Sequence, residues 1–204
     1  QTLWGRRPKI LASSATLSGY RRQSGVLYGR EARVFPYPEP KAGQGFWSGT
    51  SPEAMRKYLA VAPRGQTIEY ALDRMIVSLQ TAIRRLIADP VALAAEIGID
   101  AHHIDFLVRY YGTDVIYGNT LRDLDAVVRS GETQWEDVPS PRPRVASLTG
   151  RTMFTDVIDT LEELESPKDD FADRTHVVVG SSMMSHGVDI DRLNVMVMLG
   201  LPLT

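Results

Sequence analysis

Cysteine is absent from this 204-residue chain, which excludes disulfide bonds, thiolate metal sites and cysteine nucleophiles. Long apolar runs are absent too, since no stretch reaches the roughly 20 residues that a membrane-spanning helix requires. The first residues show no basic stretch followed by an apolar core, so no signal peptide is visible. These absences together predict a cytoplasmic protein that does not associate with membranes.

Lysine is also scarce. Four of the 23 basic residues are lysine, which leaves 19 arginines. The planar guanidinium group of arginine binds two phosphate oxygens at once, although a G+C-rich coding genome would explain the same bias. The net charge of −2 gives no bulk indication of nucleic-acid binding. With 43% hydrophobic and 24% charged residues, the composition is that of a globular protein.

The first half of the chain is predicted to be mostly helical. Residues 8–13 are an apolar run that we expect to form a short buried strand, followed by a helix over 18–28. Residues 34–53 hold four prolines and three glycines, which indicates a loop. The apolar positions of 67–88 recur with a period near 3.6 and predict the longest helix. One or two further helices are expected over 91–111.

From residue 113 onward, strands and helices alternate. This order predicts a parallel sheet, and apolar strands predict that helices cover both of its faces. The expected strands are 113–120, 144–152, 175–182 and 194–200, and the expected helices are 120–130 and 153–165. Each strand ends in glycine, serine, threonine or asparagine, at the edge of a parallel sheet where ligands bind. Such residues let backbone N–H groups approach an anion, or they cap the following helices.

Four stretches resemble motifs of superfamily 2 helicases, in the order in which that family carries them. "ILASSATLS" resembles motif III, the Ser-Ala-Thr that ends the first RecA-like domain. "DVIYGNTLRDLD" resembles motif IV, and "ASLTGRT" resembles the next strand and loop, which touch the nucleic-acid backbone. "VVVGSSMMSHGVDIDRLNVMVMLGLP" resembles motif V, with Ser181 where threonine is usual. Its "SMMSHGVDIDRLN" part is similar to helicase subunits of phage-defence systems of the DISARM type.

The resemblance implies an α/β chain with part of the P-loop NTPase (RecA-like) helicase fold. Residues 1–35 would be the end of the first RecA-like domain, and 36–112 a linker and helical insertion. Residues 113–204 would be most of the second RecA-like parallel sheet, ending before the arginine-finger motif. Because the chain lacks an initiator methionine and stops after an apolar run, we expect a fragment of a longer protein.

Three family motifs are missing from the sequence. No lysine follows a glycine, so the Gly-Lys-Ser/Thr phosphate loop is absent. The Asp-Glu dipeptide that binds Mg²⁺ and the Gln-x-x-Gly-Arg-x-x-Arg arginine-finger motif are absent as well. In the family these lie before motif III or after motif V. We therefore expect that ATP and Mg²⁺ act in the full-length parent, an ATP-dependent helicase or translocase, and that this chain alone does not hydrolyse ATP.

The resemblance also assigns roles to individual residues. Asp189 would face the nucleotide, and Gly187 would let the backbone approach it. Ser14, Ala15 and Thr16 would couple the ATP site to the nucleic-acid site. The residues expected to contact nucleic-acid phosphates are Gly118, Asn119, Thr149, Gly150, Arg151, Ser181 and Ser182. DNA is expected ahead of RNA as the partner, together with proteins of a defence system.

Other interpretations of these residues stay open. Asp189 and Asp191 would equally cap a turn before Leu193. A non-catalytic nucleic-acid-binding or scaffold module with the same fold is the alternative function, and an unrelated nucleotide-binding α/β protein is a third. The sequence has no Gly-x-Ser-x-Gly nucleophile elbow, so we do not expect His186 to belong to a hydrolase triad.

The remaining histidines, the tryptophans and four methionines are expected to have structural roles. The adjacent pair His102 and His103 would lie at the surface or in packing, because neighbouring helical residues face different directions. Trp47 and Trp135 would pack in the core or linker rather than stack on bases. The methionines expected to fill the core are Met183, Met184, Met196 and Met198.

Overall fold

The computed structural model describes residues 8–13, 19–35, 37, 49–166, 168–185, 188 and 190–200. The chain divides into two compact units, residues 1–60 and 61–204. Within the described ranges, no helix has the length and apolarity to cross a lipid bilayer.

The first unit contains one helix, α1 (Tyr20–Tyr28), among its described residues. The helix lies between Gly19 and Gly29, whose φ angles of 77° and 59° are those that glycine adopts at least cost. This confirms the helix predicted there. The buried strand predicted over 8–13 is wrong, because these residues are exposed and form no strand. A strand needs a neighbour for its backbone groups, and the described part of this unit offers none.

The second unit is built on a parallel sheet, as the alternation of strands and helices predicted. The strands are β1 (Asp114–Gly118), β2 (Val145–Leu148), β3 (Val177–Gly180) and β4 (Val195–Leu199), in the order β2-β3-β1-β4. All three pairings are parallel. The register places Tyr117 of β1 and Leu148 of β2 opposite Gly180 of β3, so these three strands end together.

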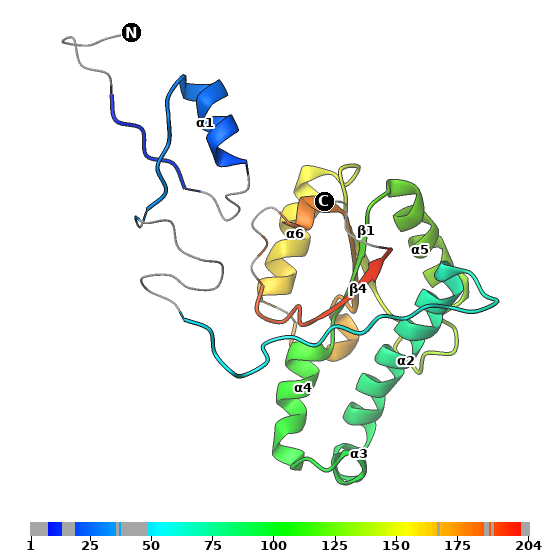
Figure 1. Ribbon diagram of the computed structural model, residues 1–204. Helices are drawn as coiled ribbons and strands as arrows, with labels where there is room; N and C mark the ends of the chain where they lie inside the picture. Colours follow the sequence, from blue (N-terminus) through cyan, green and yellow to red (C-terminus); the bar gives the residue numbers. More distant parts are fainter. Residues whose placement is uncertain are drawn as a thin grey trace. The chain divides into compact units, whose positions relative to one another are not determined.

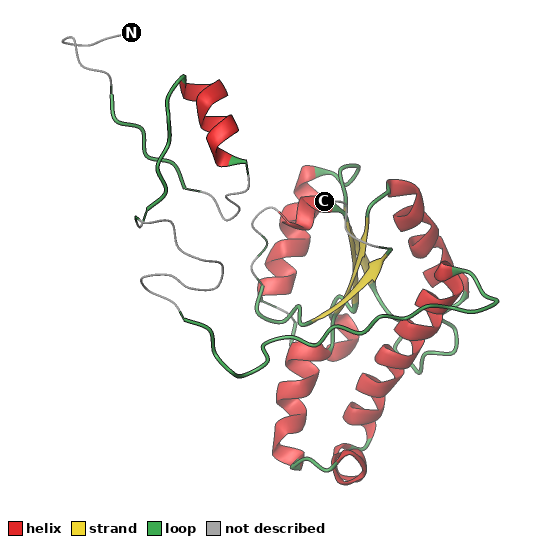
Figure 2. Ribbon diagram, viewed as in Figure 1, coloured by secondary structure: helices red, strands yellow, loops and turns green. Residues whose placement is uncertain are grey.

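Helices cover the two faces of this sheet (Figures 1 and 2). On one face α2 (Ile68–Ala88) and α5 (Leu121–Thr133) pack on alternate strand residues, which include Ile116, Val177 and Val179. On the other face lies α6 (Phe154–Glu165), which packs with Val115 and Val178. The strands β1 and β3 are therefore buried on both sides, which explains their continuous apolar runs.

The long helix α2 connects the sheet to a second, helical cluster. Thr67 caps its start by accepting a hydrogen bond from the N–H of Tyr70 at 3.2 Å. Asp89 follows its end and caps the next helix through the N–H of Ala92. The elements that follow are α3 (Pro90–Ile97), the 3-10 turn η1 (Ala101–His103) and α4 (Ile104–Tyr111). Their apolar side chains pack against the last turns of α2. The domain boundaries expected from the sequence stay a prediction.

Two short 3-10 turns, η2 (Phe171–Asp173) and η3 (Ser182–Ser185), precede and follow β3.

The prediction that helices cover both faces of every strand is wrong for β4. Met196 and Met198 remain 49% and 47% exposed, so they do not fill the core. The reason is position: among the described strands β4 lies at the edge and pairs with β1 alone, whereas α6 packs on β2 at the other end of the sheet. Met184 does pack against the apolar cluster under α6.

Candidate functional site at the carboxyl edge of the sheet

Three neighbouring strands place the residues predicted to contact nucleic acid at the carboxyl edge of the sheet. Gly118 and Asn119 end β1, residues 149–151 follow β2, and Ser181 and Ser182 follow β3. The backbone N–H of Ser181 donates to the carbonyl of Leu148 at 3.2 Å, which ties the ends of β2 and β3 together. Sequence placed these residues at separate strand ends, and the order β2-β3-β1 makes those ends adjacent.

The turn after β2 is held by its own threonines. The hydroxyl of Thr152 donates to the carbonyl of Ser147 at 2.9 Å and accepts from the N–H of Thr149 at 3.1 Å. The hydroxyl of Thr149 accepts from the N–H of Arg151 at 3.3 Å and lies 3.4 Å from the Thr152 hydroxyl. Because the Thr152 proton goes to Ser147, the Thr149 proton points at Thr152. The Thr149 hydroxyl therefore shapes the turn rather than facing solvent.

Gly150 and Arg151 occupy the exposed tip of this turn. A side chain at Gly150 would meet no atom within 4 Å, and its N–H has no partner among the described residues. The guanidinium group of Arg151 pairs with the carboxylate of Asp125 on α5 at 2.7 Å. Both side chains are largely exposed, so a phosphate from solvent would compete with Asp125 for this arginine.

The end of β1 has a structural explanation of its own. A Cβ atom at Gly118 would lie 2.6 Å from a methyl group of the buried Leu124, so glycine allows α5 to pack against the strand. Thr120 caps α5 by accepting from the N–H of Asp123 at 3.2 Å. The capping interpretation of small polar residues is thus correct at β1, whereas α6 has no side-chain cap.

The end of β3 offers a hydroxyl group. Ser181 is half-buried, and its carbonyl accepts from the N–H of Met184, which starts the η3 turn. Within the described residues its Oγ has no hydrogen-bond partner. Ser182 is exposed beside it. The loops at this edge therefore present the unpaired N–H of Gly150, the hydroxyl group of Ser181 and the guanidinium group of Arg151, whose carboxylate partner a ligand can replace.

The residues expected beside the nucleotide and those expected to couple the ATP site to the nucleic-acid site fall outside the part of the chain that the structure describes. Ser14, Ala15, Thr16, Gly187 and Asp189 lie outside the described residues, as do His186 and Trp47. In the part of the chain that the structure covers, no three His, Asp or Glu side chains cluster to bind a metal ion.

A buried polar cluster at the opposite edge was missed from the sequence. Gln80 of α2 donates to Oδ2 of Asp114 at 2.8 Å, and Arg84 donates to Oε1 of Gln80 at 2.6 Å. Arg84 also donates to the carbonyl of Pro141 at 2.7 Å. Oδ1 of Asp114 is buried without a partner. Gln80 and Arg84 stand one turn apart on the apolar stripe of α2, which is the signal that could have revealed them.

The ionisation of this cluster follows from its burial. Burial raises the pKa of Asp114 to about 7, although Gln80 and Arg84 act in the other direction. Burial also lowers the pKa of His176 to about 4, helped by the charge of Arg84. His176 Nδ1 accepts from the N–H of Arg144 at 2.9 Å, so its Nε2 carries the proton and donates to the carbonyl of Phe171 at 2.8 Å. Both ring nitrogens are satisfied in the neutral form.

Two further predictions are settled by packing. Trp135 is 1% exposed, and its Nε1 donates to Asp73 at 3.0 Å, which confirms a core role. His102 and His103 are both exposed, and Nδ1 of His102 lies 2.7 Å from Asp100. Asp191 is exposed, and its carbonyl accepts from the side chain of Asn194 at 2.6 Å.

The chain is similar to a protein described as DISARM protein DrmA from Bacillus paralicheniformis. The two are 26% identical over 212 aligned residues, which cover 96% of this chain and 18% of that protein. The relation is one of distant homology, and it agrees with the DISARM-type resemblance. No family model and no solved structure matches the chain.

Proposed function

We propose that this chain supplies nucleic-acid backbone contacts to an ATP-dependent helicase or translocase of superfamily 2 that acts in phage defence. The observation that carries the proposal is the row of polar loops that β2, β3 and β1 bring to one edge of a parallel sheet. That edge is where open parallel sheets bind their ligands. The distant homology to DrmA supports the defence setting.

The geometry favours different roles for the three residues of the turn after β2. The unpaired N–H of Gly150 and the guanidinium group of Arg151 are the donors that face solvent. Thr149, whose hydroxyl is engaged within the turn, supports them. Ser181 adds a hydroxyl from the neighbouring loop. Contacts of this kind hold a strand by its phosphates and do not read its sequence.

The remaining parts of the proposal rest on the helicase resemblance. ATP would supply the free energy for movement along nucleic acid, with Gly187 and Asp189 beside the nucleotide. The RecA-like fold, the preference for DNA over RNA and the partnership with defence proteins belong to this proposal as well. They concern the longer protein that carries this chain.

Binding of labelled single-stranded DNA to the 204-residue chain tests the contact surface. Arg151→Gln should weaken binding by about threefold to tenfold and lower the log–log salt slope by about 0.7, the value for one lost phosphate contact on a single strand. Asp125→Asn should strengthen binding by about twofold to fivefold, because it removes the competing carboxylate.

Asp137→Asn is the matched control. It removes the same charge and breaks an exposed ion pair of 3.3 Å with Arg74, beyond the far end of α5. If Asp125→Asn and Asp137→Asn change DNA affinity equally, the effect is one of net charge and Arg151 is not a contact residue.

ATP hydrolysis separates the motor from the alternative, a non-catalytic binding or scaffold module. The full-length protein should hydrolyse ATP faster with single-stranded DNA, and Asp189→Ala should reduce that rate while the protein stays folded. DNA binding without any hydrolysis would leave the binding module as the function.

A further inference from the structure

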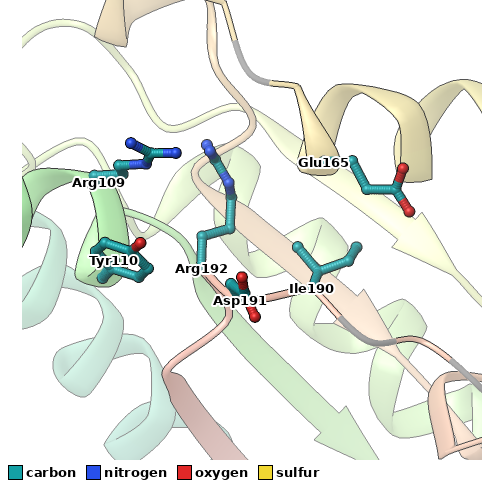
Figure 3. A pocket seen from close by; sticks show the side chains of 6 residues that line it. All are labelled: Arg109, Tyr110, Glu165, Ile190, Asp191 and Arg192. Carbon is teal, nitrogen blue, oxygen red and sulfur yellow. The ribbon is translucent and has the colours of Figure 1, made fainter.

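A second polar site lies at the amino edge of the sheet, opposite the candidate nucleic-acid edge. A cavity of about 360 Å³ opens there, within the usual range for small-ligand sites. It is lined by Arg109, Tyr110, Glu165, Ile190, Asp191 and Arg192 (Figure 3). Arg109 and Tyr110 end α4 before β1, Arg192 precedes β4, and Glu165 ends α6.

Arg192 is the unusual member of this set. It is 8% exposed, yet in the described part of the chain its guanidinium group has no hydrogen-bond or ion-pair partner. Its nitrogen atoms are not sealed from solvent, so its donors open into the cavity. A buried cation without a counter-charge is costly, and native proteins pair such groups. The missing partner is therefore expected to be a ligand.

The two charges that act most strongly on Arg192 are of its own sign. Burial lowers its pKa, and the guanidinium groups of Arg174 and Arg109 lower it further. In Figure 3 the guanidinium groups of Arg109 and Arg192 point toward the same space. The carboxylates of Asp191 and Glu165 also line the cavity, but neither forms an ion pair with Arg192 within the described residues.

The other two arginines have local explanations. Arg109 lies in the last turn of α4, where the helix dipole favours a cation. Arg174 donates to the carbonyls of Lys168 and Asp169 at 2.6 and 2.7 Å. Arg192 has no comparable explanation.

We infer that this cavity binds a terminal phosphate group through Arg192 and Arg109. A guanidinium group recessed in a cavity is reached by a group that protrudes, which excludes phosphates within a continuous strand. A phosphomonoester dianion matches two guanidinium groups in charge and can accept from both planar forks. A free nucleotide and the 5′-phosphorylated end of a strand both carry it. The site lies away from the proposed nucleic-acid edge and does not depend on it.

Calorimetric titration of the 204-residue chain tests the inference. The probes are inorganic phosphate, a nucleoside 5′-monophosphate, and one short single strand with and without a 5′-phosphate. The phosphorylated strand or the monophosphate should bind, and Arg192→Gln should weaken that binding by about tenfold. The matched control is Arg129→Gln, an exposed arginine on α5, which should leave it unchanged.

Arg109→Gln changes an exposed side chain and tests the same cavity without disturbing the interior. It should weaken phosphate binding by about threefold. Phosphate should also raise the melting temperature of the native chain and not that of Arg192→Gln. A response to the monophosphate alone identifies a nucleotide site, and a response to the phosphorylated strand alone identifies a strand end.

Several results would overturn the inference. One is that Arg192→Gln and Arg109→Gln both bind the probes as the native chain does. A second is that the 5′-phosphate makes no difference to strand binding while the monophosphate and inorganic phosphate do not bind. A third is that an acidic peptide binds in the cavity and no phosphate probe does.

Discussion

Two arginines at opposite edges of the sheet, Arg151 and Arg84, are used in opposite ways. At the carboxyl edge Arg151 is exposed, pairs with one carboxylate and lies on a turn that closes through threonine hydroxyls. At the amino edge Arg84 is 5% exposed and donates to the backbone of Pro141 and to Gln80. The first arrangement can exchange its partner for a ligand at little cost, whereas the second holds α2 and the loop before β2 together.

The amino edge also gathers the groups whose pKa values are shifted. Asp114, His176 and Arg84 lie there because α2 crosses the starts of β1 and β3 and excludes water. Shifted pKa values often mark functional sites, but a structural polar cluster produces the same shifts. Here the hydrogen bonds link α2 to strands, and the cluster is structural.

The largest effect should come from replacing one arginine at each edge with methionine and comparing the two losses of stability. Arg84→Met keeps the apolar stem and leaves the carbonyl of Pro141 and the side chain of Gln80 without donors. We expect it to lower the free energy of unfolding by about 3 kcal/mol. Arg151→Met should change it by about 0.5 kcal/mol or less, because the pair is exposed. Urea unfolding, followed by circular dichroism, measures both. Equal losses at the two edges would contradict the comparison.

The next effect is a change in the pH dependence of stability. Since the folded pKa of Asp114 is about 7 and its ordinary value is 3.8, the folded protein holds this proton more tightly than the unfolded chain. Stability from this group is therefore full below pH 4 and is lost as the pH rises to 7. His176 has the opposite effect, because its folded pKa of about 4 is below its ordinary value of 6.5. The stability that the neutral ring contributes is present above pH 6.5 and is lost as the pH falls from 6.5 to 4.

Asp114→Asn separates the two contributions. The amide keeps an acceptor for Gln80 and cannot ionise, so the variant should gain about 2 kcal/mol at pH 8 relative to the native chain. The gain is less than the full linkage value because the amide N–H group would replace Oδ1, which is buried without a partner. Below pH 6.5 the variant should lose stability through His176 alone. Urea unfolding at pH 4, 6 and 8 measures this. A native chain that is most stable at pH 8 would refute the assignment.

The smallest effect compares two glycines within the carboxyl edge. Gly118→Ala forces a methyl group against the side chain of Leu124, which is buried, and should cost about 1–2 kcal/mol. Gly150→Ala meets open space and should cost less than about 0.5 kcal/mol. Thermal unfolding measures both. If Gly150→Ala is as destabilising as Gly118→Ala, the tip of the turn is not free to meet a ligand.

Sequence patterns predicted the elements that local periodicity defines. The apolar repeat of 67–88 and the alternation after residue 113 gave α2 and the four strands, because burial of one helical stripe or of a strand leaves a regular pattern. The same patterns failed at 8–13, where no strand forms, and they wrongly predicted that both faces of β4 are buried. An apolar run indicates that burial of its side chains would be favourable. It does not indicate whether another helix or strand is present to bury them.

The sequence by itself determined a parallel α/β sheet with polar residues at its strand ends, since both follow from short-range order along the chain. The tertiary structure decided which strand ends are adjacent, that Thr149 supports a turn whose tip is Gly150 and Arg151, and that Asp114, Gln80 and Arg84 meet in the interior. It also decided that Arg192 lies buried beside a cavity, with no ion-pair partner among the described residues. The adjacency of the strand ends and the meeting of α2 with Asp114 depend on where the elements come to lie on the sheet, and such long-range contacts leave no periodic mark in the sequence. The Thr149 turn is held by contacts two to five residues apart, but no periodic pattern in the sequence indicates which hydroxyl group accepts which N–H.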